Sequence, residues 1–225
     1  MATRESADVN LYRIVPFERL VQLLSTDQLH FSHPSVWDDP YETLITHARS
    51  SEVFAQCWCR KGVSDAMWRI YSPHRLSVRI HTTSTRLASA LTKAASLGDF
   101  WFKVANVRYV NPFEYMTHVA FVKSAIQRGA TNHRIASSLF LKRRAFDHEA
   151  EVRVVVVPQA TAPGMTNTGL KVKVNARELI DHVMLDPRAP DEFVDIYSHY
   201  LHSTLGFKGK VLKSQLYASG DAREH

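Results

Sequence analysis

The stretch RAFDHEAEVR, residues Arg144–Arg153, runs directly into four valines at Val154–Val157. We interpret it as an apolar β-strand that is preceded by charged residues. Because side chains alternate along a strand, Glu149, Glu151 and Arg153 are predicted to share one face. Adjacent negative charges cost free energy unless a cation or ligand meets them. The stretch therefore predicts a binding or active site rather than an ordinary solvent-exposed surface. It does not identify the reaction.

Length and composition bound the fold. The 225 residues are 45% hydrophobic and 22% charged, which suits one well-filled core. We expect a single domain over 1–225, with its core at about 11–217 and loose ends at 1–8 and 218–225. Predicted strands and helices mix without a strict βαβ rhythm, so we predict an α+β fold with a mixed or antiparallel sheet and flanking helices.

Periodicity and turn residues predict the elements. Strands are expected at 11–15, 28–32, 52–59, 76–81, 100–110 (one long or two short), 149–157, 170–174, 182–185 and 210–212. In 76–81, Leu76, Val78 and Ile80 alternate with Ser77, Arg79 and His81, which predicts a half-buried strand. Helices are expected at 16–24, 64–72, 84–96, 115–128, 132–144, 176–179 and 191–205. Ser84 and Asp191 are predicted caps, and residues 35–42 a loop.

The charge balance points to anionic partners. A net charge of +6 and a pI near 9.4 favour nucleic acid, nucleotides or acidic protein surfaces. They also fit a moderately basic protein with no such partner. No apolar run approaches a membrane span and no signal peptide opens the chain, so we expect no membrane association. Oligomeric state is not predicted.

Cys57 and Cys59 are the only cysteines. Positions two apart on a strand rarely meet disulfide geometry, so free thiols and a reducing cytoplasm are expected. The twelve histidines are scattered without ligand spacing, so no metal is expected.

The segment Trp37–Glu42 gathers acids and rings around Pro40. It contains the carboxylates Asp38, Asp39 and Glu42 and the rings Trp37 and Tyr41. These groups suit a cation, a sugar or ribose hydroxyls, with the rings stacking on a base. A rigid loop, in which Asp38 or Asp39 caps a turn, explains the same residues. The two interpretations are compatible.

Two other places carry candidate binding residues. Tyr12 and Arg13 lie on the first predicted strand, where the guanidinium suits a phosphate or a salt bridge to Glu149 or Glu151. Trp68 and Tyr71 lie on one predicted helix face with Met67, a pattern more typical of core than of a cofactor site. On the strand that carries Glu149 and Glu151, one glutamate would serve as a base and the other would orient it. In the structural alternative, both glutamates form ion pairs with arginine or lysine.

The order of these motifs resembles a bacterial family without a settled function, domain of unknown function 2971. The likeness extends from about Leu11 to Tyr217. It rests on Leu11-Tyr12-Arg13, Leu29–Pro34, Trp37–Glu42, Cys57–Cys59, Met67–Ser72 and Phe146–Arg153. The chain has Asp38, Cys59 and Phe146 where the family has asparagine, serine and tryptophan.

A weaker similarity to ADP-ribosyltransferases implies specific roles. Arg13 would contact the phosphates or ribose of NAD, and Glu151 would stabilise the charge on the ribose as nicotinamide leaves. Glu149 would orient the acceptor, and Trp68 or Tyr71 would stack on the ring. The middle serine motif of those enzymes has no clear counterpart, since Thr83-Ser84-Thr85 fits a helix cap.

Three hypotheses follow. The first is an NAD-using transferase or glycohydrolase of the toxin, effector or phage-defence type. The second is a non-catalytic module that binds a nucleotide, nucleic acid or protein. The third is a metal-dependent nuclease, which requires Asp38, Asp39, Glu149 and Glu151 to converge. All three predict one pocket lined by Arg13, Trp37–Glu42, Trp68, Tyr71 and Glu149–Arg153.

Overall fold

The computed structural model describes residues 8–62, 64–98, 100–159, 162 and 164–218. It confirms an α+β fold with mixed strand pairing and flanking helices. The chain divides into two compact units, one made of residues 1–28, 61–87 and 175–225 and the other of 29–60 and 88–174. The predicted single domain therefore stays a prediction, and most of its expected loose ends, 1–7 and 219–225, lie outside the described residues.

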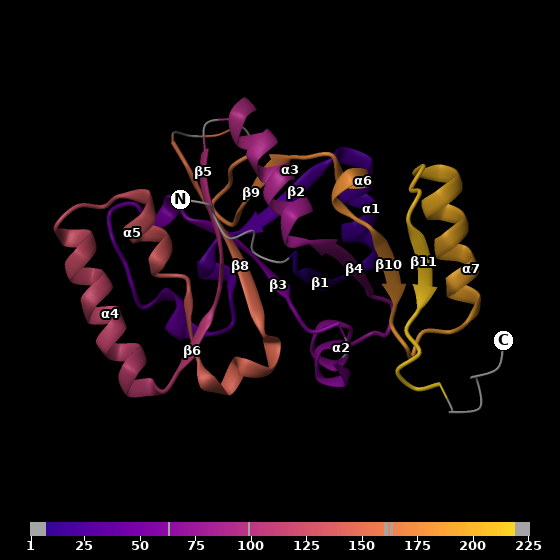
Figure 1. Cartoon of the computed structure of the whole chain (residues 1–225), viewed down its shortest axis with the longest axis horizontal. Helices are drawn as coiled ribbons and strands as arrows, with labels where there is room; N and C mark the ends of the chain where they lie inside the picture. The colour runs from indigo at the N-terminus through magenta and orange to yellow at the C-terminus, as the bar shows by residue number, and fades with distance from the viewer. Residues whose placement is uncertain (1–7, 63, 99, 160–161, 163, 219–225) are drawn as a thin grey trace. The chain divides into compact units, whose positions relative to one another are not determined.

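The first unit contains four paired strands in the order β11-β10-β4-β1. Their bounds are β1 Asn10–Val15, β4 Val78–Thr83, β10 His182–Leu185 and β11 Lys210–Lys213. β4 pairs antiparallel with both β1 and β10, whereas β10 and β11 are parallel. In Figure 1 the parallel pair is drawn in orange and yellow, with α7 beside β11.

The helices of the first unit are short. They are α1 Phe17–Thr26, α2 Asp65–Tyr71, α6 Ala176–Leu179 and α7 Glu192–His199, which continues as a π-helix at Tyr200–Thr204. Ser64, the first residue of the predicted helix 64–72, accepts a hydrogen bond from the backbone N–H of Met67 and is the N-cap of α2. Asp191 makes no side-chain cap; its carboxylate instead pairs with Lys213 at 2.6 Å.

The central strand β4 differs from the sequence prediction. Alternation between Leu76 and Ile80 predicted a half-buried strand, but Leu76 lies outside β4 and is exposed. Arg79 and His81, expected on a solvent face, are buried. β4 is the central strand of this sheet, and the rings of Tyr12 and His182 on its two neighbouring strands pack against Arg79 and His81.

Helix α3, Ser84–Leu97, straddles the boundary between the units. It was predicted to be capped by Ser84, which is its first residue. The hydroxyl of Thr83 accepts the hydrogen bond from the N–H of Arg86, and the carboxylate of Asp8 accepts from the N–H of Thr85. The cap therefore lies one residue earlier, with a second acceptor from a distant segment.

The larger set of paired strands in the second unit has the order β9-β2-β3-β8-β5. Their bounds are β2 Gln28–Ser32, β3 Phe54–Cys59, β5 Phe100–Asn106, β8 Glu151–Pro158 and β9 Gly169–Lys173. β8 runs antiparallel to both β3 and β5 (Figure 1), and all eight of its residues are buried. Because the side chains on both faces of β8 are buried, the run Val154–Val157 has no polar alternation.

Two helices and a small parallel sheet complete this unit. They are α4 Pro112–Gln127, α5 Asn132–Ser137, β6 Arg108–Val110 and β7 Leu141–Arg143. Asn111 and Glu114 form a reciprocal capping box, so α4 begins three residues before the predicted start at Tyr115. The predicted strand at 100–110 is resolved as two, β5 and β6. Short 3₁₀ helices at Pro34–Val36 and Pro40–Thr43 replace the predicted loop, and another lies at Ser50–Glu52.

The prediction of a helix over 132–144 is wrong after Ser137. The hydroxyls of Ser137 and Ser138 bond back to helix carbonyls at 2.8 and 2.7 Å, which competes with helix propagation. The following residues pair as β7 with β6, a contact between distant segments that periodicity does not report. No helix of the described residues is long and apolar enough to cross a membrane.

Candidate functional site

The acidic segment is folded by its own carboxylate. Asp39 is the N-cap of the 3₁₀ helix Pro40–Thr43, and its Oδ1 accepts from the N–H of Tyr41 at 3.1 Å. The same oxygen accepts from Nη2 of Arg143 at 2.9 Å. Asp39 and Glu42 are buried, whereas Asp38 is exposed. The predicted cap thus belongs to Asp39, and the segment directs Glu42 inward.

The residues just before β8 do not form the extended strand that the sequence predicted. Residues Arg144–Glu149 form a 3₁₀ helix, Ala150 adopts a left-handed conformation with φ 44°, and the strand begins at Glu151. Glu149 therefore does not share a strand face with Glu151 and Arg153, and that prediction is corrected. The left-handed residue breaks the alternation of side chains.

Lys142 nevertheless brings the acids together. Its ammonium nitrogen Nζ lies 2.5 Å from Glu149, 3.7 Å from Glu151 and 3.9 Å from Glu42. Lys142 is itself buried. We call the five residues Glu42, Lys142, Glu149, Glu151 and Arg153 the carboxylate cluster.

Arg153 is the centre of the carboxylate cluster and is fully buried. Its Nη2 donates to both carboxylate oxygens of Glu151, at 2.9 and 2.8 Å, and lies 2.6 Å from Oε1 of Glu42. Nη1 donates to the carbonyl of Leu139 at 2.7 Å. The guanidinium carbon lies 4.6 Å from the centre of the Trp37 ring. One side chain thus joins the acidic segment to the carboxylate strand.

In the carboxylate cluster, burial disfavours the charged form of each group, whereas an oppositely charged neighbour favours it. For Glu151, burial raises the pKa, but the charge and hydrogen bonds of Arg153 outweigh it, so the pKa is lowered. For Glu42, burial prevails over the same guanidinium and the pKa is raised. Burial opposes the charge of Lys142, yet the three surrounding glutamates raise its pKa. The sequence alone treats these glutamates as alike, and the structure separates them.

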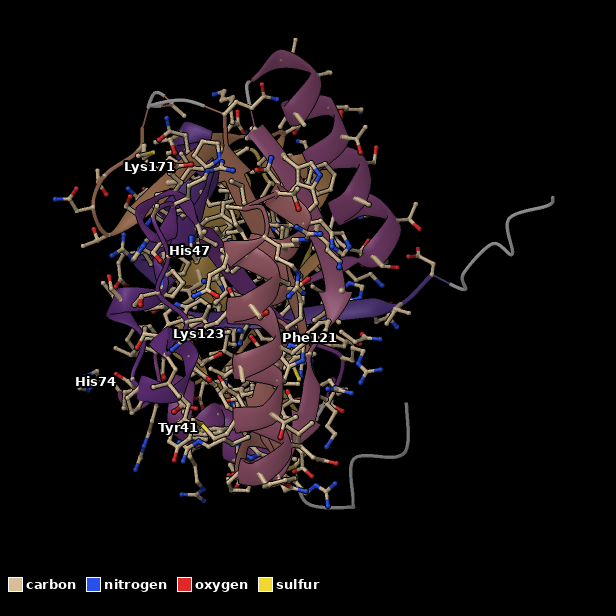
Figure 2. The ribbon with its side chains drawn as sticks, turned by 90° about the vertical axis from the view of Figure 1, so that its left-hand side faces the viewer. Tyr41, His47, His74, Phe121, Lys123 and Lys171 are labelled. Carbon is tan, nitrogen blue, oxygen red and sulfur yellow. The ribbon has the colours of Figure 1, made fainter. Side chains whose placement is uncertain are left out.

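Several residues of the site were not selected from the sequence. The hydroxyl of Tyr109 accepts from the N–H of Glu151 at 2.8 Å, and the Cys57 thiol hydrogen-bonds to the Glu151 side chain. Burial raises the pKa of Cys57, which keeps it a protonated donor. Tyr115 donates to the carbonyl of Tyr41 at 2.7 Å. Figure 2 shows Tyr41 next to α4, the helix that carries Tyr115. No local pattern marks these partners.

The side chains of Asp39 and Arg143 each contain one buried polar atom without a hydrogen-bond partner among the described residues. Oδ2 of Asp39 and Nε of Arg143 are both buried without a hydrogen bond to the described part of the chain. The Arg143 guanidinium stacks 4.2 Å from the Tyr41 ring centre and 5.3 Å from that of Phe146. A buried acceptor and a buried donor next to aromatic rings are features of a place where a polar ligand binds.

The remaining candidates, Tyr12, Arg13, Trp68 and Tyr71, belong to the first unit. Arg13 lies opposite Ile80 in the β1–β4 pair, and the Tyr12 ring lies 4.8 Å from the guanidinium carbon of Arg79. Trp68 is buried and Tyr71 is exposed. The prediction of a pocket shared with the carboxylate cluster therefore stays a prediction.

Comparisons with known proteins give little to set beside this geometry. No family model matches the chain, and no curated protein matches it. Among solved structures, DarT of Thermus sp. 2.9 in complex with NAD⁺ aligns with a TM-score of 0.44 and 10% identity, over 92% of this chain and 96% of that one. The same protein with carba-NAD⁺ aligns with a TM-score of 0.43, at the same identity and coverage.

Proposed function

We propose that this chain is an NAD-using enzyme of the ADP-ribosyltransferase or glycohydrolase type, with Glu151 at its reacting centre. The observation that carries the proposal is a buried carboxylate that the Arg153 guanidinium keeps ionised in a fixed orientation. When the bond between C1′ of the ribose and nicotinamide breaks, positive charge develops on the ribose. A preorganised anion in a low-dielectric site stabilises that charge more strongly than water does.

The step balances without a redox partner. The electron pair of the glycosidic bond leaves with nicotinamide, which departs as a neutral molecule. A nucleophilic oxygen of water or of an acceptor then forms a bond to C1′ and gives up its proton. Glu149, held by Lys142, is the base we assign to that proton.

Binding groups for the rest of NAD are available in the second unit. The unpartnered Oδ2 of Asp39 suits a ribose hydroxyl, which is a hydrogen-bond donor. The rings of Trp37 and Tyr41 suit stacking on a planar base.

Release of nicotinamide tests this proposal. Wild-type protein incubated with NAD should release nicotinamide, and Glu151→Gln should lower the rate by about 10²- to 10⁴-fold because it removes a charge that acts in the transition state. Glu192→Gln is the matched control, since Glu192 is exposed, lies outside every predicted site residue and should leave the rate unchanged. Thermal melting shows that each variant is folded.

Glu149→Gln separates the two halves of the reaction. It should slow transfer to the acceptor, while NAD binding, measured by calorimetry, is retained. Free ADP-ribose as product indicates a glycohydrolase, and a mass increase on an added acceptor indicates a transferase. Wild-type protein that binds NAD but releases no nicotinamide, with or without cell extract as acceptor, would contradict the proposal.

One observation favours the second hypothesis, a non-catalytic binding module. Glu151 is only 3% exposed, and a carboxylate so enclosed by Arg153 also suits a structural role. Such a module should bind a nucleotide or nucleic acid in a salt-dependent manner without turnover. The nuclease hypothesis has less support, because Asp39, Glu149 and Glu151 already pair with arginine or lysine and Asp38 is exposed.

A further inference from the structure

Two histidines and an aspartate meet at the start of β10 in the first unit. His182 lies directly opposite His81 in the antiparallel β4–β10 pair, and Asp181 precedes His182. The N–H of Asp181 donates to the carbonyl of His81 at 2.9 Å. The two imidazole rings stack with centroids 4.3 Å apart. Backbone pairing thus places three side chains with metal-binding atoms at one point.

The carboxylate of Asp181 lies between the two rings. Its Oδ2 is 3.2 Å from Nδ1 of His81 and 3.0 Å from Nδ1 of His182. One such atom from each residue lies within 4.8 Å of the other two. Two ligands of a tetrahedral zinc ion, each about 2.0–2.1 Å from the metal, are about 3.3 Å apart. The separations around Asp181 already approach that value.

Asn10 lies beside the second ring nitrogen of His81. Nε2 of His81 is 3.1 Å from Oδ1 of Asn10, an acceptor, so the tautomer with its hydrogen on Nε2 can donate to that oxygen. In a neutral ring protonated at Nε2, the lone pair of Nδ1 faces the Asp181 oxygen. A cation bound at this point would accept both the Nδ1 lone pair and a lone pair of the Asp181 oxygen.

Arg86 orients the carboxylate from the other side. Its Nη1 lies 3.1 Å from Oδ1 of Asp181, which leaves Oδ2 directed at the two imidazoles. A metal-binding histidine commonly donates its second N–H to a carbonyl or carboxylate, and binding carboxylates are commonly hydrogen-bonded themselves. Asn10 and Arg86 occupy these two supporting positions. The side chain of Asp181 is 41% exposed, so an ion can enter from solvent.

We propose that His81, Asp181 and His182 form a binding site for a divalent transition-metal ion, with zinc as the ion that best fits two imidazoles and one carboxylate. The fourth position is open to water or to a ligand. This site is independent of the carboxylate cluster and of the proposed NAD chemistry. It departs from the expectation that the chain binds no metal.

Metal titration of the full chain, purified without a histidine tag, tests the site. Zn²⁺ followed by calorimetry, and Co²⁺ followed by its visible absorption, should each saturate at one equivalent. His182→Ala should weaken binding by more than about 100-fold, and Asn10→Ala, which removes only the supporting acceptor, by about 10- to 100-fold. NMR signals of His81 and His182 should shift together during the titration.

The control is His74→Ala, because His74 is exposed in the same unit and its side chain projects outward in Figure 2. It should bind Zn²⁺ as the wild type does. His81 is buried, so its substitution can unfold the protein; His182→Ala and Asp181→Asn, checked by circular dichroism, avoid this difficulty. Absence of binding, or equal binding by wild type, His182→Ala and Asp181→Asn, would overturn the proposal.

Discussion

Arg153 holds Glu151 through a two-pronged contact from two residues further along the same strand. Its Nη2 donates to both carboxylate oxygens and its Nε donates to Oε1 at 3.1 Å. Both side chains are buried on β8. The pair is therefore built into the core of the second unit, and its chemistry and its contribution to folding are linked.

Removing the guanidinium should destabilise the fold strongly. Arg153→Met leaves Glu42, Glu149 and Glu151 with Lys142 as the remaining cation of the carboxylate cluster. Breaking a buried pair in this way costs about 3–5 kcal/mol, measurable by urea denaturation. Arg60→Met is the matched control, since Arg60 is exposed next to β3 and its loss should stay within about 0.5 kcal/mol. A loss below about 1 kcal/mol for Arg153→Met would contradict this account.

Acid should weaken the protein through Glu151. Its pKa is lower in the folded than in the unfolded chain, so the group stabilises the fold above its unfolded pKa of about 4.3. That contribution is lost as the pH falls through the folded pKa. The unfolding free energies of wild type and Glu151→Gln should therefore differ by a constant amount at neutral pH and converge below about pH 4. A gap that persists at lower pH would contradict the lowered pKa.

Glu42 should behave in the opposite sense. Its pKa is raised in the folded chain because burial disfavours its charge, so the protonated form stabilises the fold below the unfolded pKa. That stability is lost as the pH rises through the folded pKa. Glu42→Gln should thus be more stable than wild type at neutral pH, and the gain should vanish under acid. A less stable Glu42→Gln at pH 7 would show that Arg153 needs the Glu42 charge.

Asp39 should matter for the cap and for Arg143. Asp39→Ala removes the acceptor for the N–H of Tyr41 and the partner of Arg143. The free energy of unfolding should therefore fall by at least the roughly 0.5–2 kcal/mol that loss of an N-cap costs. Asp39→Asn retains an acceptor for the cap and should lose less. Thermal melting compares the two variants with Asp38→Ala, which should resemble wild type. Equal losses for Asp38→Ala and Asp39→Ala would contradict the assigned cap.

Local signals predicted most of the elements and failed where pairing is distant. The predicted helix over 132–144 ends at Ser137 because residues 141–143 pair with 108–110, some thirty residues earlier. Glu149 left the predicted strand face because Ala150 turns left-handed. Local spacing of metal-binding residues did not predict the site at His81, Asp181 and His182, because His81 and Asp181 are 100 residues apart.

The sequence by itself determined the α+β class, the buried valine strand and the placement of Glu151 and Arg153 on one face of that strand, since all three follow from residue type and short spacing. Only the tertiary structure decided which acid lies beside which base. It added Glu42 and Lys142 to the cluster and gave Glu42 and Glu151 opposite pKa shifts. The physical reason is that a charge responds to burial and to neighbours in space, and those neighbours come from distant parts of the chain.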